Sequence, residues 1–238
     1  MKVTDSLYIL PLAEKGGEIQ EVIYPSLILD EQHGPTLVDT GMPDREGAIE
    51  ALLKEIGIRL EDIRRIILTH QDLDHVGSAA AIVQASCVEV WAHAAETPYI
   101  EGTLRSIRLP PPALLEKLPP AVRAVLEKGA EPLRVDRQLQ GGEVLDIAGG
   151  LRVIFTPGHT PGHISLYLER DRVLIAADAV TVHEGRVQLP RAPVTPDMPE
   201  AKRSIARLAD LDLTTLVAYH GGVAQGDVRG QLRRLIEN

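Results

Sequence analysis

Histidine and aspartate side chains are concentrated in one short segment, residues 69–78, which reads T-H-Q-D-L-D-H-V-G-S. Four of its residues are candidate metal ligands: His70, Asp72, Asp74 and His75. The segment follows the apolar run R-I-I-L, a predicted buried strand, and precedes a predicted small-residue helix. Because a strand end is rigid, a polar loop there can direct several side chains at one point. The pattern predicts metal binding; a solvated acidic turn with helix-capping aspartates is the alternative.

Histidine or aspartate also follows three other predicted strands. Residues 156–163 read T-P-G-H-T-P-G-H and contribute His159, Asp178 ends the run V-L-I-A-A-D, and His220 follows L-T-T-L-V-A-Y. Small residues stand beside these side chains and allow close backbone approach. Four such strand ends in one chain favour a common metal site over four unrelated turns. Imidazoles and carboxylates are the usual ligands of zinc and of harder divalent ions.

The elements that must position these residues alternate along the chain. In the first half, strands are expected at 3–10, 22–29, 36–39, 65–68 and 87–92, and helices between Pro43 and Gly57 and over 77–85. In the second half, strands are expected at 144–147, 151–156, 165–168, 173–177 and 213–219, and helices after a capping Asp197 and over 227–236. Two sheets packed together with helices outside would bury the apolar faces. The sequence therefore predicts an α/β fold.

Residues 97–132 differ in character from the rest. Prolines stand at 98, 110–112 and 119–120, and the apolar residues between them fit two short amphipathic helices, the second starting at Pro120. We interpret this segment as an inserted helical cap, because a linker would lack the apolar stripe. Residues 1–238 then form a single domain with one insertion.

Composition narrows the classes of partner. The chain has 238 residues, a hydrophobic content of 44% and a formal net charge of −9. This charge argues against binding to nucleic acid or to an anionic membrane, and a 3% aromatic content argues against a base-stacking surface. No signal peptide or membrane-spanning run is visible, so a cytoplasmic protein is expected. The one cysteine, Cys87, excludes an internal disulfide and is expected in the core.

Taken in order, these motifs resemble the metallo-β-lactamase superfamily, and the resemblance covers almost the whole chain. It implies a four-layer αββα sandwich with a dinuclear metal site at one edge of the two sheets. It also implies a metal-dependent hydrolase. By position, one ion would be bound by His70, Asp72 and His159, the other by Asp74, His75 and His220, and Asp178 would bridge them.

Two positions depart from the family pattern. Asp72 stands where the family has its second histidine, and Tyr219 stands where many members have glycine before the final histidine. With Asp72, Asp74 and Asp178 the ligands carry one more negative charge, which weakens the activation of bound water and favours manganese or iron somewhat. Zinc is still the metal expected first, because four imidazoles remain. A weak first site that leaves a mononuclear centre is the alternative.

These features predict hydrolysis of a small ester, lactone or thioester, in which two divalent ions activate water and polarise the scissile carbonyl. Asp74 or Asp178 would orient the water and accept a proton. The alternatives are a phosphodiester or phosphotriester hydrolase, an iron-dependent oxidoreductase related to flavodiiron or sulfur-dioxygenase branches, and a binding protein without catalysis. The expected partner is a small-molecule substrate, and a homodimer is compatible with the sequence.

Four further residues receive supporting or substrate-binding roles. The resemblance implies that Asp39, at the end of T-L-V-D, and His163 orient the ligands or their loops and do not bind metal. Tyr99, in the cap, could donate a hydrogen bond to the substrate, with anchoring of the cap as the alternative. His183 could face either the cleft or the solvent.

Overall fold

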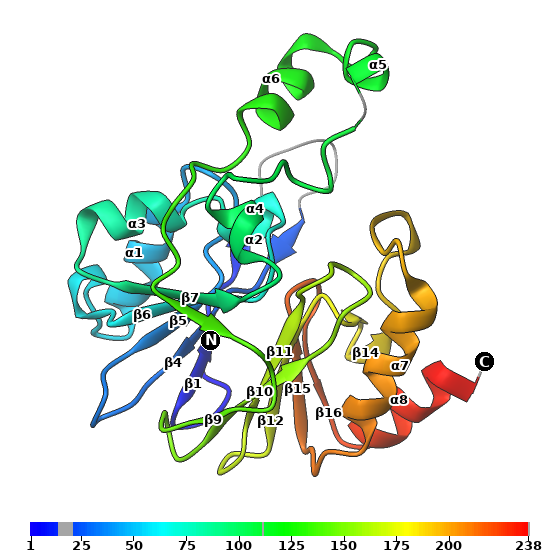
Figure 1. Cartoon of the computed structure of the whole chain (residues 1–238). Helices are drawn as coiled ribbons and strands as arrows, with labels where there is room; N and C mark the ends of the chain where they lie inside the picture. Colours follow the sequence, from blue (N-terminus) through cyan, green and yellow to red (C-terminus); the bar gives the residue numbers. More distant parts are fainter. Residues whose placement is uncertain (14–20, 111, 238) are drawn as a thin grey trace.

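The computed structural model describes residues 1–13, 21–110 and 112–237 and arranges them in four layers (Figure 1). Two six-stranded sheets face each other, and helices cover their outer sides. The predicted αββα sandwich is therefore confirmed. Among the described residues, no helix is both long enough and apolar enough to cross a membrane.

The first sheet comes mainly from the first half of the chain. Its neighbouring strands, in spatial order, are β1 (Leu7–Ile9), β4 (Ser26–Ile28), β5 (Thr36–Val38), β6 (Arg65–Leu68), β7 (Glu89–His93) and β8 (Arg137–Leu139). The strands from β5 to β8 are parallel, so helical crossovers must connect them. Helix α1 (Glu46–Glu55) follows β5, and α2 (Leu73–Val76) and α3 (Ala79–Ala85) follow β6.

The second sheet comes from the second half of the chain. Its order is β16 (Gly222–Gln225), β15 (Thr215–Ala218), β12 (Val173–Ala177), β11 (Ile164–Leu168), β10 (Leu151–Phe155) and β9 (Val144–Leu145). Only β12 and β15 pair in parallel among these strands, and the crossover between them carries helix α7 (Met198–Ala209). The side chain of Asp197 accepts a hydrogen bond from the amide of Glu200 at 2.9 Å, which is the predicted cap of α7. Helix α8 (Val228–Glu237) packs beside α7.

Alternation along the central strands explains why the layers stack. In β6, Ile67 joins the core between the sheets, whereas Ile66 and Leu68 face the core under the first helical layer. In β12, Ile175 points between the sheets and Leu174 points toward α7 and α8. Because successive side chains leave a strand on opposite faces, a strand that is apolar at every position is buried on both faces.

Several small elements were not predicted. They are the strand β2 (Leu12–Ala13), the hairpin of β13 (Thr181–His183) with β14 (Arg186–Gln188), the edge strands β8 and β16, and the short helices α2, α4 (Thr97–Ile100), η1 (Leu60–Asp62) and η2 (Ala192–Val194). The strand expected at 22–29 is divided into β3 (Val22–Ile23), which pairs with β2, and β4. The prediction for Cys87 is wrong, because its side chain is exposed. Strand β7 begins two residues later, at Glu89, so Cys87 lies in the turn after α3.

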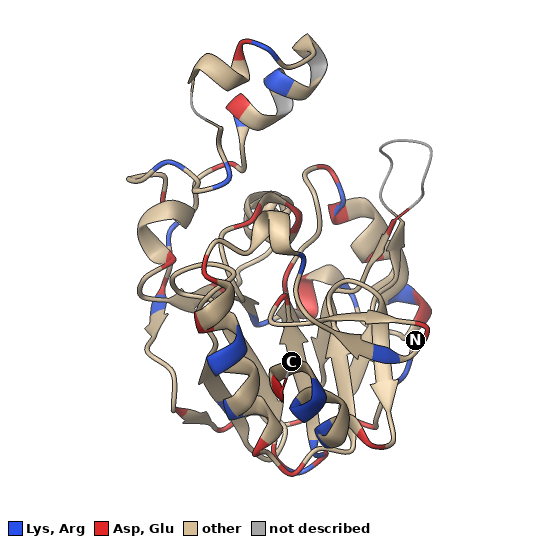
Figure 2. Ribbon diagram, turned by 90° about the vertical axis from the view of Figure 1, so that its right-hand side faces the viewer, with Lys and Arg blue, Asp and Glu red and all other residues tan. Residues whose placement is uncertain are grey.

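Three helices lie in the segment predicted as a cap. Helix α4 (Thr97–Ile100) packs on the first half of the molecule, whereas α5 (Pro112–Leu115) and α6 (Pro120–Lys128) project away from the four layers in both views (Figures 1 and 2). The expected start of the second cap helix at Pro120 agrees with the observed start of α6. Residue 111, which falls in the expected cap, lies outside the described residues.

Candidate metal centre

The predicted ligands meet at one edge of the sandwich, because each follows a strand that ends there. His70 comes two residues after β6, Asp178 directly after β12 and His220 two residues after β15. The loop between β10 and β11 supplies His159. Glycines allow this crowding. Gly221 has a φ of +98°, and a Cβ there would lie 1.7 Å from the carbonyl oxygen of Val182.

One set of ligand atoms, which we call the His159 group, consists of His70, Asp72 and His159. The Oδ2 atom of Asp72 lies 3.5 Å from Nε2 of His70 and 3.0 Å from Nε2 of His159. All three side chains are buried. The one-residue departure from the family pattern therefore still places a carboxylate oxygen among the imidazole nitrogens.

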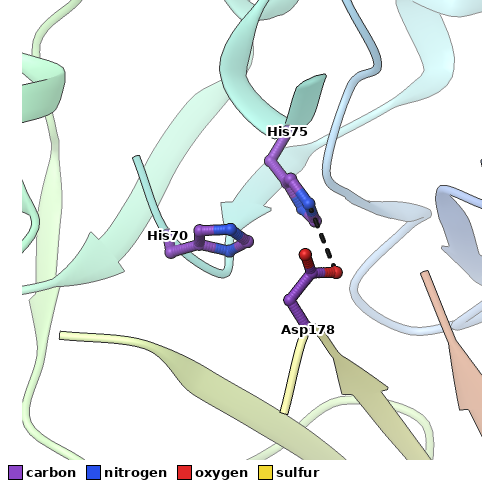
Figure 3. A group of neighbouring side chains, drawn as sticks. All are labelled: His70, His75 and Asp178. Carbon is purple, nitrogen blue, oxygen red and sulfur yellow. Dashed lines mark ion pairs between the residues drawn. The ribbon is translucent and has the colours of Figure 1, made fainter. Parts of the chain in front are cut away.

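A second set, the His220 group, consists of Asp74, His75 and His220. The Oδ2 atom of Asp74 lies 3.3 Å from Nε2 of His220 and 3.8 Å from Nε2 of His75. Asp178 lies between the two groups. Its Oδ1 is 3.5 Å from Nε2 of His75, and its Oδ2 is 3.4 Å from Nε2 of His220 and 3.5 Å from Nε2 of His159. Figure 3 shows Asp178 directed at His75 with His70 beside them.

These atoms fit divalent metal ions. A tetrahedral ion with bonds of about 2.0–2.1 Å holds its ligand atoms about 3.3–3.4 Å apart, close to most of the separations above. Among the described residues, three buried atoms at this point make no hydrogen bond: Nε2 of His70, Nε2 of His75 and Oδ1 of Asp178. Buried polar atoms normally have a partner, and a shared cation would provide one. The His and Asp clusters thus indicate divalent metal binding.

Hydrogen bonds to their Nδ1 atoms fix the imidazole rings of His70 and His75. The Nδ1 atom of His75 donates to Oδ2 of Asp39 at 2.9 Å, and Thr69 donates its hydroxyl proton to the same oxygen at 2.8 Å. The hydroxyl of Thr69 can then accept from Nδ1 of His70 at 3.0 Å. Both rings therefore direct Nε2 toward the site. These contacts agree with the ligand-orienting role expected for Asp39, which stays a prediction; its own φ of +61° marks a constrained backbone.

The other two imidazoles are oriented in the same way. Glu21, which is also paired with Arg191, accepts a hydrogen bond from Nδ1 of His220 at 2.9 Å. The Nδ1 atom of His159 lies 3.4 Å from the hydroxyl of Thr195. Sequence reasoning did not identify Glu21 or Thr195, and no local pattern marks either of them. In each of the four histidines, Nδ1 thus faces the surrounding protein and Nε2 faces the carboxylates of the cluster.

His163 contacts the backbone of Asp178, and both of its ring nitrogens have hydrogen-bond partners within the chain. Its Nε2 accepts a hydrogen bond from the backbone amide of Asp178 at 3.1 Å. Its Nδ1 must then carry the proton, which it donates to the hydroxyl of Thr156 at 2.8 Å. Burial lowers the pKa of His163 well below its ordinary value, which keeps the ring neutral. These contacts agree with the supporting role expected for His163, which stays a prediction.

The charges of the site favour cations. Burial alone would lower the pKa of His220, but the charges of Asp178 and Asp74 outweigh burial and raise this pKa to about 10. Likewise, burial would lower the pKa of His75, but Asp39, Asp74 and Asp178 raise it well above its usual range. Burial would raise the pKa of Asp178, and the imidazoles hold it well below 3.8 instead. The negative charge of the carboxylates thus stabilises positive charge at this point, and either protons or metal ions can supply that charge.

Arg108, in the segment between α4 and α5, is a further member of the site that sequence reasoning missed. Its Nε donates to both oxygens of Asp72, at 2.9 and 2.7 Å. Its Nη2 lies 2.9 Å from Nε2 of His159 and 3.0 Å from the carbonyl oxygen of the same residue. Contact between the cap segment and the His159 group is therefore direct.

A buried carboxylate, Glu96, ties the ligand loops together. It is fully buried and accepts hydrogen bonds from the amide of Gln71 at 3.0 Å, from the Gln71 side chain at 3.1 Å and from the amide of Gly162 at 2.6 Å. Sequence analysis did not assign Glu96 to the site. It could have been found from its position three residues after β7, in the run W-A-H-A-A-E, because polar site residues also follow the neighbouring strands.

Tyr219, the second departure from the family pattern, is structural. Its ring is buried and lies against His75, with the ring centroids 3.8 Å apart and the ring planes tilted by 30°. The hydroxyl donates to the backbone carbonyl of Asp74 and accepts from the amide of Gly41 at 3.2 Å. Tyr219 therefore joins three of the loops that surround the His220 group.

A cavity of about 900 Å³ opens over the cluster. Asp72, Asp74, Asp178, His159 and His220 lie at its polar side. Its apolar walls come from the cap and from the segment before α7, with Ile107, Leu109, Leu126, Pro193 and Val194. Of the two predicted substrate contacts, Tyr99 does not line this cavity, and the exposed His183 lines a neighbouring depression beside His220.

Comparison with known proteins gives concordant matches. A family model described as the metallo-beta-lactamase superfamily matches residues 22–220, a range that includes all seven side chains of the cluster. The probable metallo-hydrolase YflN of Bacillus subtilis strain 168 is 32% identical over 84% of this chain and 80% of its own length. An N-acyl homoserine lactonase of Bacillus thuringiensis subsp. kurstaki is 27% identical over 77% of this chain and 74% of its own.

A solved structure agrees with these sequence matches. The crystal structure of a metallo-beta-lactamase family protein from Thermus thermophilus superposes with a TM-score of 0.79 at 28% identity. The superposition covers 99% of this chain and 80% of the other.

Proposed function

The chain belongs to the metallo-beta-lactamase superfamily and is a metallo-hydrolase, and from this premise we propose that it hydrolyses a small ester, lactone or thioester. The observation that carries the proposal is the position of Asp178, whose two oxygens lie within 3.5 Å of imidazole nitrogens from both ligand groups. This arrangement supports two divalent ions side by side. We propose zinc as the metal, with manganese or iron as alternatives because Asp72 adds a hard oxygen ligand.

Bound at these atoms, divalent ions would supply Lewis acidity and allow water to be deprotonated at neutral pH. The chain itself supplies the remaining functions. The Asp74 side chain is 30% exposed, faces the cavity and can accept a proton from water in its ionised form. Burial would raise the pKa of Asp74, but His75 and His220 lower it, so the carboxylate is ionised at neutral pH.

The cavity supports a substrate that has an apolar part. Its walls carry aliphatic side chains and prolines around one polar side, a combination typical of small-molecule sites. An acyl group would lie against Pro193 and Val194, with its carbonyl toward the cluster. The name of the lactonase relative provides separate support for an acyl substrate. The cytoplasmic location and a homodimer remain predictions.

A substrate panel tests the proposal. Protein stripped of metal and reloaded with zinc or manganese is assayed with p-nitrophenyl esters, lactones, thioesters and phosphodiesters. We expect metal-dependent turnover of an acyl substrate, with Asp178→Asn inactive. The matched control is Asp146→Asn, which makes the same change at an aspartate whose side chain is 89% exposed. Turnover confined to phosphodiesters, or no metal-dependent turnover in any class, would overturn the proposal.

Metal analysis separates hydrolysis from redox chemistry. We expect colourless divalent ions in protein purified without added metal, and two per chain once metal is supplied in excess. Stoichiometric iron with redox-active absorption would support the oxidoreductase alternative, which Asp72 motivates.

A further inference from the structure

Arg108 places the chain's own positive charge in the His159 group. We propose that Arg108 and a cation in this group exclude one another, so that the His220 group loads first and the His159 group loads only when the Arg108 segment moves away. This inference rests on the proposed metal site.

The exclusion follows from the chemistry of one nitrogen. A neutral imidazole has a single lone pair on its unprotonated nitrogen. The Nε2 atom of His159 lies 2.9 Å from Nη2 of Arg108 and 3.0 Å from Oδ2 of Asp72, and it accepts from the guanidinium in the tautomer whose proton is on Nδ1, 3.4 Å from the hydroxyl of Thr195. The same lone pair is the one that a cation in the His159 group would need. Arg108 and the cation therefore compete for one electron pair.

Asp72 strengthens the competition. Both of its oxygens accept from Nε of Arg108, and the pair is largely buried, with side-chain exposures of 10% and 22%. Charge-assisted hydrogen bonds of this kind are about twice as strong as neutral ones. The carboxylate that replaces the family's histidine thus has a positively charged partner within the chain.

The His220 group has no such competitor among the described residues. Nε2 of His75 makes no hydrogen bond, and Nε2 of His220 faces only Asp74 and Asp178. The nearby Arg191 lies on the opposite side of the ring, 3.0 Å from Nδ1 of His220. The two groups therefore differ in accessibility to a cation, although their ligand types are similar.

The segment that carries Arg108 has few attachments to the body. The amide of Ile107 donates to Oε1 of Gln71 at 3.1 Å, and Gln71 is itself held by Glu96. Beyond this point the chain leads into α5 and α6, which project into solvent (Figure 2). Among the described residues, release of Arg108 then requires the loss of its own contacts and of the hydrogen bond from the amide of Ile107 to the side chain of Gln71. Loading of the His159 group should therefore loosen residues 106–109.

Stepwise metal titration tests the proposal. Chelator-stripped protein is titrated with zinc and with manganese by calorimetry, against a competing chelator where binding is tight. We expect wild-type protein to bind one equivalent tightly and the second more weakly. In Arg108→Met the second equivalent should bind about 10- to 100-fold more tightly, the range expected when one charged hydrogen-bonding competitor is removed, with the first equivalent unchanged.

The control is Arg105→Met, which removes the same charge from an exposed position in the same segment. Second-equivalent affinities that agree between the two variants, or weaker binding in Arg108→Met, would overturn the proposal. Amide hydrogen exchange gives an independent measurement. Exchange at residues 106–109 should accelerate with the second equivalent and not with the first. A wild-type protein that binds no metal would instead refute the proposed function.

Discussion

Replacing Tyr219 by phenylalanine tests whether the residue before the final histidine supports the site. The change keeps the ring that lies against His75 and removes only the hydroxyl. That hydroxyl satisfies the buried amide of Gly41 and the partly buried carbonyl of Asp74. A buried donor left without a partner costs about 1–3 kcal/mol, and the carbonyl adds a smaller loss. We expect the free energy of unfolding to fall by about 2–3 kcal/mol.

For a chain of this size that loss lowers the midpoint of thermal unfolding by about 4–12 °C. The measurement is made in excess chelator, because bound metal would add its own stabilisation. Tyr167→Phe is the matched control, since the hydroxyl of Tyr167 donates to a single carbonyl, that of Asp212, at 2.7 Å and far from the cluster. We expect a loss below about 1 kcal/mol there. Equal midpoints for the two variants would refute the structural role of Tyr219.

Three further outcomes are expected at the cluster. The pKa of His220 is raised to about 10 and that of His75 is also raised well above its usual range, so the His220 group must release protons on binding metal, and its affinity for an ion should rise at least about tenfold per pH unit between pH 7 and 9; calorimetric heats that do not depend on the buffer would contradict this. Asp178→Ala should lose more metal than Asp72→Ala by elemental analysis, since Asp178 lies against both groups; equal metal contents would argue against a bridge. Asp72→His should bind zinc more tightly, whereas an unchanged zinc affinity would mean that position 72 does not contact the ion.

The core of the site was predictable because its signal is local. His70, Asp178 and His220 stand at or just after the end of an apolar strand, and Asp74 and His75 lie in the polar run that follows β6; strand ends that share a sheet edge meet in space. Runs of apolar residues identified those strands. Small residues beside the ligands indicated turns in which backbone segments approach one another closely. The four layers followed from the same runs, since strands apolar at every position must be covered on both faces.

The supporting residues were not predictable because their partners are remote in sequence. Arg108 is 36 residues from Asp72, Glu96 is 66 residues from Gly162, and Glu21 is 199 residues from His220. No periodicity or spacing connects positions so far apart. A charged residue in a polar loop is usually solvated, so composition alone assigns none of these side chains to the site.

The chain order of the ligands has a mechanical consequence. Four of the seven side chains follow strand β6 of the first sheet, and the other three come from the second sheet. An ion held by both sets joins the two halves of the sandwich at one edge, as a disulfide would, but reversibly. At a free metal concentration about 100 times the dissociation constant, such a bond adds about 2.7 kcal/mol to the folded state. In a chain with a single cysteine, metal supply would then regulate how firmly the two sheets stay together.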